Sequence, residues 1–292
     1  MTRRETLAVL LAAPSAAQAR RLPPLCLFSK HLPKLNWDEL GKTVKQMGFD
    51  GVDLTVRAAG HVLPERAGED LPKALDAIRA HGIEVPMITT GLVSASDPAA
   101  RPTLGAAARG RVPYFKLGYW RYRNAKRVET ILDDVKRDTA GLVALAKEYG
   151  IEAGFHNHSG DYVGTAVWDT RAIIGAMEPQ WIGYYYDPCH ATAEGGVYGW
   201  RLSLQVALPR IKMVALKDFY WAKKGREWKM TMCPLGEGMV DWKTVFGDLA
   251  RGNFSGPISL HVEYETPDEP AAIARDFEFM KKTITAAYGA KT

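Results

Sequence analysis

Short apolar segments alternate with longer amphipathic segments along most of the chain, and this alternation is the strongest constraint on its fold. After Arg20 the short segments recur eight times, each followed by residues with the helical spacing of apolar positions. The predicted strands are Leu25–Ser29, Gly51–Val56, Glu84–Thr89, Tyr114–Leu117, Glu152–His156, Ile182–Tyr186, Lys212–Leu216 and Ile258–Glu263. The predicted helices are Trp37–Met47, Leu71–His81, Val128–Tyr149, Thr170–Met177, Leu202–Leu208, Trp242–Arg251 and Pro270–Ala287, with a further short helix over Pro98–Arg109.

Glycines mark the ends of several predicted helices. Gly48, Gly82 and Gly150 each stand shortly before a predicted strand, where a glycine at positive φ typically ends a helix. Eight strand–helix units indicate an α/β protein with a (β/α)8 TIM barrel. A doubly wound open sheet is the alternative, but no G-x-G-x-x-G motif follows the first strand. No linker divides the chain, so we predict a single barrel domain over 20–292.

The first residues have a composition unlike that of the barrel. Arg3 and Arg4 precede a short apolar stretch, and Ala17-Gln18-Ala19 resembles a cleavage site. We therefore predict a twin-arginine-type export signal over 1–19 and a periplasmic location. The alternative is a frayed N-terminal helix of a cytoplasmic protein.

Composition restricts the remaining classes. No run of 18 apolar residues exists, so no membrane span is expected. The net charge of +5 is spread without a dense Lys/Arg block, which is typical of an ordinary soluble surface and does not indicate a nucleic-acid partner. Cys26, Cys189 and Cys233 lack metal-type spacing, and we expect three buried thiols.

Polar side chains follow nearly every predicted strand, where TIM barrels carry their reactive groups. These positions hold Lys30-His31, Arg57 with His61, Thr89-Thr90, Lys116 with Tyr119-Trp120, His156-Asn157-His158, Asp187-Pro188-Cys189-His190, Lys217-Asp218 and His261-Val262-Glu263-Tyr264-Glu265. Residues two apart on a strand point to one face, so His156 and His158 should lie together, as should His261 and Glu263. Unpaired imidazoles and carboxylates are expensive to bury. A divalent metal or a charged network around a polar substrate would satisfy them.

Several of these motifs resemble a known family, the sugar phosphate isomerase/epimerase group of xylose-isomerase-like TIM barrels, which also includes the endonuclease IV type. The resemblance covers residues 25–285. It rests on Gly48–Leu54, Phe155-His156-Asn157-His158, Tyr186-Asp187-Pro188-Cys189-His190, Leu216-Lys217-Asp218, Leu235-Gly236-Glu237-Gly238 with Val240-Asp241-Trp242, and Val262-Glu263.

The resemblance implies one divalent metal held by a Glu, an Asp, a His and a Glu on strands five to eight. Asp187 and Glu263 match this pattern, whereas His156 stands at the position of the first Glu and Ala215 at that of the His. Imidazole and carboxylate ligands suit Mn, Zn, Fe or Co, and Mg is also compatible with the family pattern. The expected metal ligands are His156, Asp187, Glu263 and His261.

The remaining site residues receive provisional roles. Glu263, Lys217 and His158 are the candidate catalytic groups. The candidate substrate-binding residues are Arg57, His61, Lys116, His190 and Trp120, with Tyr119 and Trp221 as further aromatic faces for a sugar ring.

The resemblance implies a metal-assisted isomerase, epimerase or lyase that abstracts a proton next to the carbonyl of a keto-sugar or polyol. An exported enzyme would meet free or oxidised sugars rather than phosphorylated ones. The alternatives are a non-catalytic or metal-free sugar-binding barrel and a metal-dependent nuclease of the endonuclease IV type.

Overall fold

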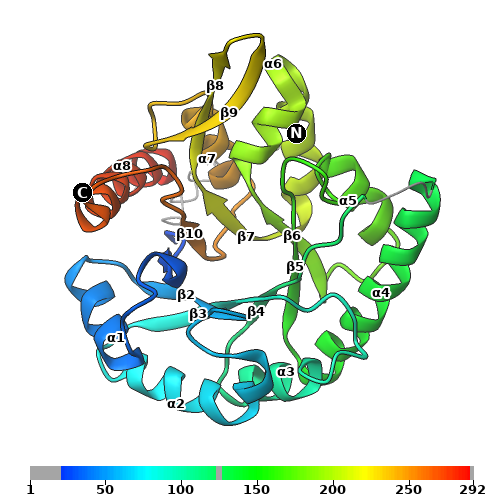
Figure 1. Ribbon diagram of the computed structural model, residues 1–292, viewed down its shortest axis with the longest axis vertical. Coiled ribbons are helices and arrows are strands. Elements are labelled where there is room, and N and C mark those ends of the chain that lie inside the picture. Colours follow the sequence, from blue (N-terminus) through cyan, green and yellow to red (C-terminus); the bar gives the residue numbers. More distant parts are fainter. Residues whose placement is uncertain (1–20, 123–126, 290–292) are drawn as a thin grey trace, which may run out of the picture.

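A computed structural model describes residues 21–122 and 127–289, and their central feature is a closed barrel of eight parallel strands (Figure 1). The strands are β1 (Leu25–Phe28), β2 (Gly51–Val56), β3 (Glu84–Thr90), β4 (Tyr114–Lys116), β5 (Glu152–His156), β6 (Ile182–Tyr186), β7 (Ile211–Leu216) and β10 (Ile258–Leu260). Around the barrel the order is β1-β10-β7-β6-β5-β4-β3-β2. The predicted single TIM barrel is therefore confirmed.

Helices form the outer ring of the barrel (Figure 1). They are α1 (Trp37–Gln46), α2 (Ala67–Arg79), α3 (Ala100–Arg109), α4 (Val128–Tyr149), α5 (Val167–Ile174), α6 (Pro188–Ala207), α7 (Trp242–Arg251) and α8 (Glu269–Tyr288). The glycines Gly48, Gly82 and Gly150 have φ of 87°, 70° and 67°, as predicted for residues that end helices.

Two predicted boundaries are wrong in ways that affect the site. The helix expected over 202–208 begins at Pro188, because the Asp187 side chain accepts a hydrogen bond from the His190 amide and caps it. Gly196 has non-helical backbone angles and interrupts its apolar pattern. The last barrel strand ends at Leu260, so Glu263 lies on the following loop rather than on a strand.

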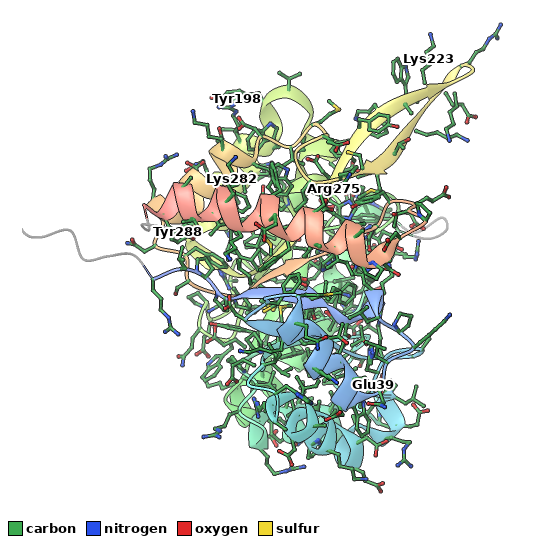
Figure 2. All side chains as sticks on the ribbon, turned by 90° about the vertical axis from the view of Figure 1, so that its left-hand side faces the viewer. Glu39, Tyr198, Lys223, Arg275, Lys282 and Tyr288 are labelled. Atoms are coloured by element: carbon green, nitrogen blue, oxygen red, sulfur yellow. The ribbon has the colours of Figure 1, made fainter. Side chains whose placement is uncertain are left out.

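An antiparallel hairpin that the sequence analysis missed follows β7. It consists of β8 (Asp218–Lys224) and β9 (Glu227–Cys233), and it projects from the body of the protein with Lys223 near its tip (Figure 2). The buried Asp218 carboxylate anchors its base, since it accepts hydrogen bonds from the amides of Gly236 and Val240 and from the Trp242 indole.

A small apolar cluster fills the barrel interior below the strand ends. It consists of Met87, Tyr185, Met213 and Ala215, and all four are fully buried or nearly so. Glycines make room for it: Gly154 pairs with Gly183 across β5 and β6, and a Cβ on Gly154 would collide with the end of Met213. The interior is therefore a packed core that closes the barrel beneath the strand ends.

Gly183→Ala should destabilise the protein by about 1–3 kcal/mol, the usual range for overpacking. An added Cβ would collide with the Arg210 backbone carbonyl, which cannot rotate away as a flexible side chain could. Urea unfolding measures the change. Gly199→Ala is the matched control, since a Cβ there meets nothing within 4 Å. Equal stability of the two variants would contradict this account of the packing.

Three further expectations concern the N-terminal segment, the cysteines and membrane spans. The predicted export signal over 1–19 lies outside the described residues. The three cysteines are buried free thiols, as predicted. None of the helices within 21–122 and 127–289 has the length and apolar character needed to cross a membrane.

Candidate active site

A small cavity of about 120 Å³ lies at the carboxyl ends of the barrel strands. Ten of the residues singled out in the sequence line it: Lys30, Arg57, Thr89, Lys116, Tyr119, His156, His158, Lys217, His261 and Glu263. They come from seven different strands or the segments that follow them, so the fold brings together groups more than 200 residues apart. The predicted convergence at the barrel mouth is confirmed for these residues.

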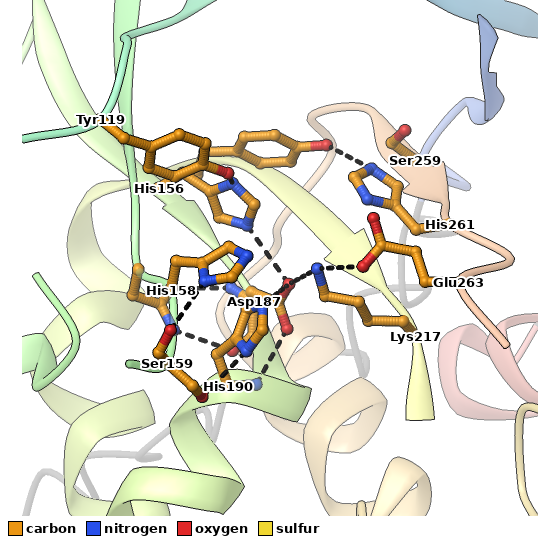
Figure 3. A network of polar contacts seen from close by, with 12 residues as sticks. Tyr119, His156, His158, Ser159, Asp187, His190, Lys217, Ser259, His261 and Glu263 are labelled. Carbon is orange, nitrogen blue, oxygen red and sulfur yellow. Dashed lines mark hydrogen bonds and ion pairs between the residues drawn. The ribbon is translucent and has the colours of Figure 1, made fainter. Parts of the chain in front are cut away.

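Lys217 lies at the centre of the charged groups. Its Nζ is 3.3 Å from Asp187 Oδ2 and 3.1 Å from Glu263 Oε2, and its side chain is 2% exposed (Figure 3). Burial alone would lower the pKa of Lys217, but Asp187 and Glu263 raise it above its ordinary value. Lys217 is therefore an ammonium ion. Because Asp187 Oδ2 and Glu263 Oε2 both contact its Nζ, these two oxygens are no more than 6.4 Å apart, the sum of the two distances.

Both carboxylates remain ionised for the same reason. Burial would raise the pKa of Asp187, but His190 and Lys217 hold it below its usual value. Burial would likewise raise the pKa of Glu263, but Lys217, His261 and Lys30 hold it well below its usual range. The sequence analysis noted Lys30 without giving it a role, and its Nζ lies 3.1 Å from Glu263 Oε1.

His156 has both ring nitrogens engaged. Its Nε2 lies 3.2 Å from Asp187 Oδ2, an acceptor, so Nε2 carries the proton and Nδ1 accepts from the Tyr119 hydroxyl at 2.7 Å. Burial, followed by the charge of Lys217, lowers the pKa of His156 well below its usual value. The neutral ring therefore fixes the Tyr119 hydroxyl at the cavity, a polar role for Tyr119 that the sequence analysis missed.

His158 is a neutral imidazole, and one of its nitrogens has no hydrogen-bond partner among the described residues. Its Nδ1 lies 2.9 Å from the Ser159 carbonyl, which can only accept, so Nδ1 carries the proton and Nε2 keeps its lone pair. Burial, followed by the charge of Lys217, lowers the pKa of His158 from 6.5. His158 therefore has the protonation state of a general base.

A buried carboxylate within a strand contacts two residues that line the cavity, Thr89 and Tyr185. Asp53 on β2 accepts from the hydroxyls of Thr89, Tyr185 and Ser259. The Tyr185 oxygen also lies 3.0 Å from His261 Nε2, which orients that ring. The sequence analysis gave Asp53 and Tyr185 no role, because an isolated polar residue inside an apolar strand carries no signal of its own.

Three predicted substrate-binding residues do not line this cavity. Both ring nitrogens of His61 are used within the fold, by the Thr55 hydroxyl and the Leu32 carbonyl. The Trp120 indole donates to Asp138 and stacks on Phe155. His190 lies behind the cavity, where its Nδ1 contacts Ser159 Oγ and its Nε2 is 3.7 Å from Asp187.

The four expected metal ligands do not form a metal site here. His156 has no free nitrogen, and the Lys217 ammonium lies between Asp187 and Glu263. His261 contacts Tyr185 through Nε2, and its buried Nδ1, which has no hydrogen-bond partner among the described residues, is a single free donor or acceptor. Within 21–122 and 127–289, no three His, Cys, Asp or Glu side chains are grouped so that they could hold an ion. Ala215 is fully buried against Met87, Tyr185 and Met213, so a histidine there would have no room.

Another histidine of the barrel mouth, His31, couples stability to pH. Its Nε2 accepts from the Val262 amide and its Nδ1 lies 3.1 Å from Glu269, an arrangement that requires the neutral ring. Burial is the main cause that lowers the pKa of His31 from 6.5 to about 3. Below pH 6.5 the unfolded chain therefore binds a proton that the folded protein does not.

We expect stability that is fully present above pH 6.5 to fall as the pH drops from 6.5 toward 3. The slope due to His31 should be at most about 1.4 kcal/mol per pH unit. His31→Gln keeps one donor and one acceptor but does not titrate, so its acid slope should be shallower. Urea unfolding at a series of pH values measures both slopes. Identical slopes for wild type and variant would refute the assignment.

The chain belongs to the xylose isomerase-like TIM barrel family, whose sequence pattern matches residues 42–283. Among individual proteins, inosose dehydratase of Bacillus velezensis is 29% identical over 151 residues, which are 47% of this chain and 50% of that protein. Inosose dehydratase of Lactiplantibacillus plantarum is 26% identical over 161 residues, 50% of this chain and 52% of that protein. The matched region thus spans about half the length of these curated relatives.

Solved structures support the fold. The 3-keto-D-glucoside 4-epimerase of E. coli superimposes with a TM-score of 0.70 at 15% identity, over 89% of this chain and 99% of that one. A xylose isomerase-like TIM barrel protein from Mycobacterium smegmatis, in complex with magnesium, gives 0.71 at 14% identity, over 94% and 100%. At these identities the similarity concerns the barrel alone.

Proposed function

We propose that this protein is a sugar isomerase, epimerase or lyase that moves a proton at the carbon next to the carbonyl of a keto-sugar or related polyol. The observation that carries the proposal is the pairing of a neutral imidazole base, His158, with a buried ammonium, Lys217, in one cavity. Abstraction of that proton creates negative charge on the carbonyl oxygen, which a nearby cation stabilises. Inosose dehydratases among the relatives and an epimerase among the structural neighbours are consistent with this class of reaction.

Each residue of the cavity has a place in this reaction. His158 Nε2 takes the proton, and Lys217 stabilises the resulting enediolate oxygen. The Tyr119 hydroxyl, oriented by His156, accepts a hydrogen bond from a substrate hydroxyl. Glu263 holds Lys217 and Lys30 rather than acting as the base, since its low pKa makes it a weak proton acceptor.

Two further basic residues, Lys116 and Arg57, favour a substrate that carries a carboxylate. Lys116 is 2% exposed with its Nζ 3.4 Å from the Tyr119 ring centroid, and Arg57 lies over Phe28. Neither has an ion-pair partner among the residues that the structure describes. Burial, followed by the charge of Arg57, lowers the pKa of Lys116 well below its usual value. A substrate carboxylate beside Lys116 would stabilise its charged form and offset the cost of burying that charge.

The substrate must extend beyond the small cavity. A space of about 120 Å³ is below the usual range for a ligand pocket. Glu263 also lines a second cavity of about 820 Å³, with Tyr220 of the hairpin and Tyr264 on its walls. We propose that the reacting carbon lies beside His158 and Lys217 and the rest of the sugar reaches toward this larger cavity.

Proton exchange tests the proposal directly. Free and carboxylated keto-sugars are incubated with the protein in D2O, and NMR follows the signal of the hydrogen next to the carbonyl. We expect protein-dependent deuterium incorporation, fastest with carboxylated substrates. Binding of these sugars without any exchange would overturn the enzyme proposal and favour the non-catalytic sugar-binding barrel.

A further inference from the structure

The position of the Lys217 ammonium coincides with the one expected for a metal. Its Nζ bridges Asp187 and Glu263, the two carboxylates that match the metal-binding pattern of the family. A divalent ion bound by both would lie about 2.0–2.6 Å from their oxygens. Such an ion and the ammonium would compete for the same small volume between these oxygens.

The charges of this group already balance. Asp187 and Glu263 supply two negative charges, and Lys217 and Lys30 supply two positive ones. His156, whose place in the pattern belongs to a glutamate, is neutral and adds no negative charge. A divalent ion added to this arrangement would leave an excess of positive charge in a largely buried group, at a high electrostatic cost.

The ammonium also keeps a donor for a ligand. Lys217 has three N–H groups; one donates to Glu263 Oε2, and Asp187 Oδ2 is an ion-pair partner at 3.3 Å. Lys217 itself lines the cavity that holds His158. At least one N–H of Lys217 is therefore available to an oxygen atom bound there.

We propose that the Lys217 ammonium is the resident cation of this barrel mouth and performs the electrostatic task otherwise assigned to a divalent metal. In this arrangement Asp187 and Glu263 hold Lys217 instead of an ion, and the packed Ala215 replaces a ligand that has become unnecessary. That Lys217 stabilises an enediolate rests on the proposed function. That Lys217 occupies the place of a metal ion does not depend on it.

The test measures melting temperature and bound metal, and needs no substrate. Chelator-treated wild-type protein is titrated with Mn²⁺, Zn²⁺ and Mg²⁺, and bound metal is counted by mass spectrometry after dialysis. We expect no stoichiometric metal and an unchanged Tm. Stoichiometric metal with a raised Tm in the wild type would overturn the proposal.

Two variants distinguish the contribution of Lys217 from that of the neighbouring Lys30. Lys217→Ala leaves two carboxylates without their shared cation, so its Tm should fall by about 6–12 °C. Ethylammonium or Mn²⁺ should reverse much of this fall, since either can enter the vacated space. Lys30→Ala is the matched control: Lys30 contacts Glu263 at the same 3.1 Å distance but is 49% exposed and does not touch Asp187. Its Tm should not respond to Mn²⁺.

A Lys217→Ala protein that neither loses Tm nor responds to either cation would refute the proposal. If this variant does not fold, the wild-type titration and Lys217→Arg, which keeps a positive charge and should stay insensitive to metal, still decide the question. Failure of the D2O exchange experiment would overturn the proposed function without affecting these readouts.

Discussion

Replacing Asp187 with alanine should lower the free energy of unfolding by about 3–5 kcal/mol, the range expected when one partner of a buried ion pair is removed. The carboxylate is fully buried, and it contacts the Lys217 ammonium, the His156 ring and the His190 amide. Its loss would leave Glu263 to balance two lysines. It would also remove the cap of α6, which alone contributes about 1 kcal/mol.

A second capping aspartate isolates the effect of the buried charge. Asp241 caps α7 through the Thr244 amide, and its side chain is 38% exposed. Asp241→Ala should therefore cost about 1 kcal/mol, the value for a lost cap. Chemical denaturation of both variants, with Asp187→Asn as the isosteric replacement, measures the difference. An Asp187→Ala protein no less stable than Asp241→Ala would contradict the assigned role of the ion pair.

Replacing His158 with alanine should reduce kcat by about 10²–10⁴-fold, the usual contribution of a general base. The fold should survive, because the hydrogen bond of this ring goes to the adjacent Ser159 carbonyl and its other contacts are packing against rings such as those of Tyr162 and His190. Substrate binding should change less than kcat. His81→Gln is the matched control, since His81 follows α2 and pairs with Asp38 outside the mouth. Unchanged turnover in His158→Ala would exclude it as the base.

The pH dependence of kcat/KM gives a second, independent test of His158 as the general base. A base acts only when it is deprotonated, and burial together with Lys217 lowers the pKa of His158 from 6.5. The acid limb of kcat/KM should therefore fall below pH 6.5, with full activity retained at neutral pH. A limb centred above that value would show that another group abstracts the proton.

The barrel could be predicted because its signals are local. The spacing of apolar residues that is typical of a helix or a strand can be recognised within about a dozen residues. Glycines such as Gly150 mark helix ends without reference to the rest of the chain. The hairpin was missed because its exposed strands bury few apolar residues and therefore lack the strand pattern used elsewhere. Its signal is the turn at Gly225, where φ is 66° between two segments that pair residue for residue.

The sequence alone predicted most, though not all, of the residues that meet at the barrel mouth, because parallel strands bring their carboxyl ends to one edge whatever lies between them. It could not decide what these residues do to one another. His156 and His158 look equivalent in sequence, yet one has both nitrogens occupied and the other keeps a free lone pair. That difference depends on which acceptor each ring faces. Likewise, only the tertiary structure places Lys217 between Asp187 and Glu263, 30 and 46 residues away, since the direction of a side chain is set by packing around it.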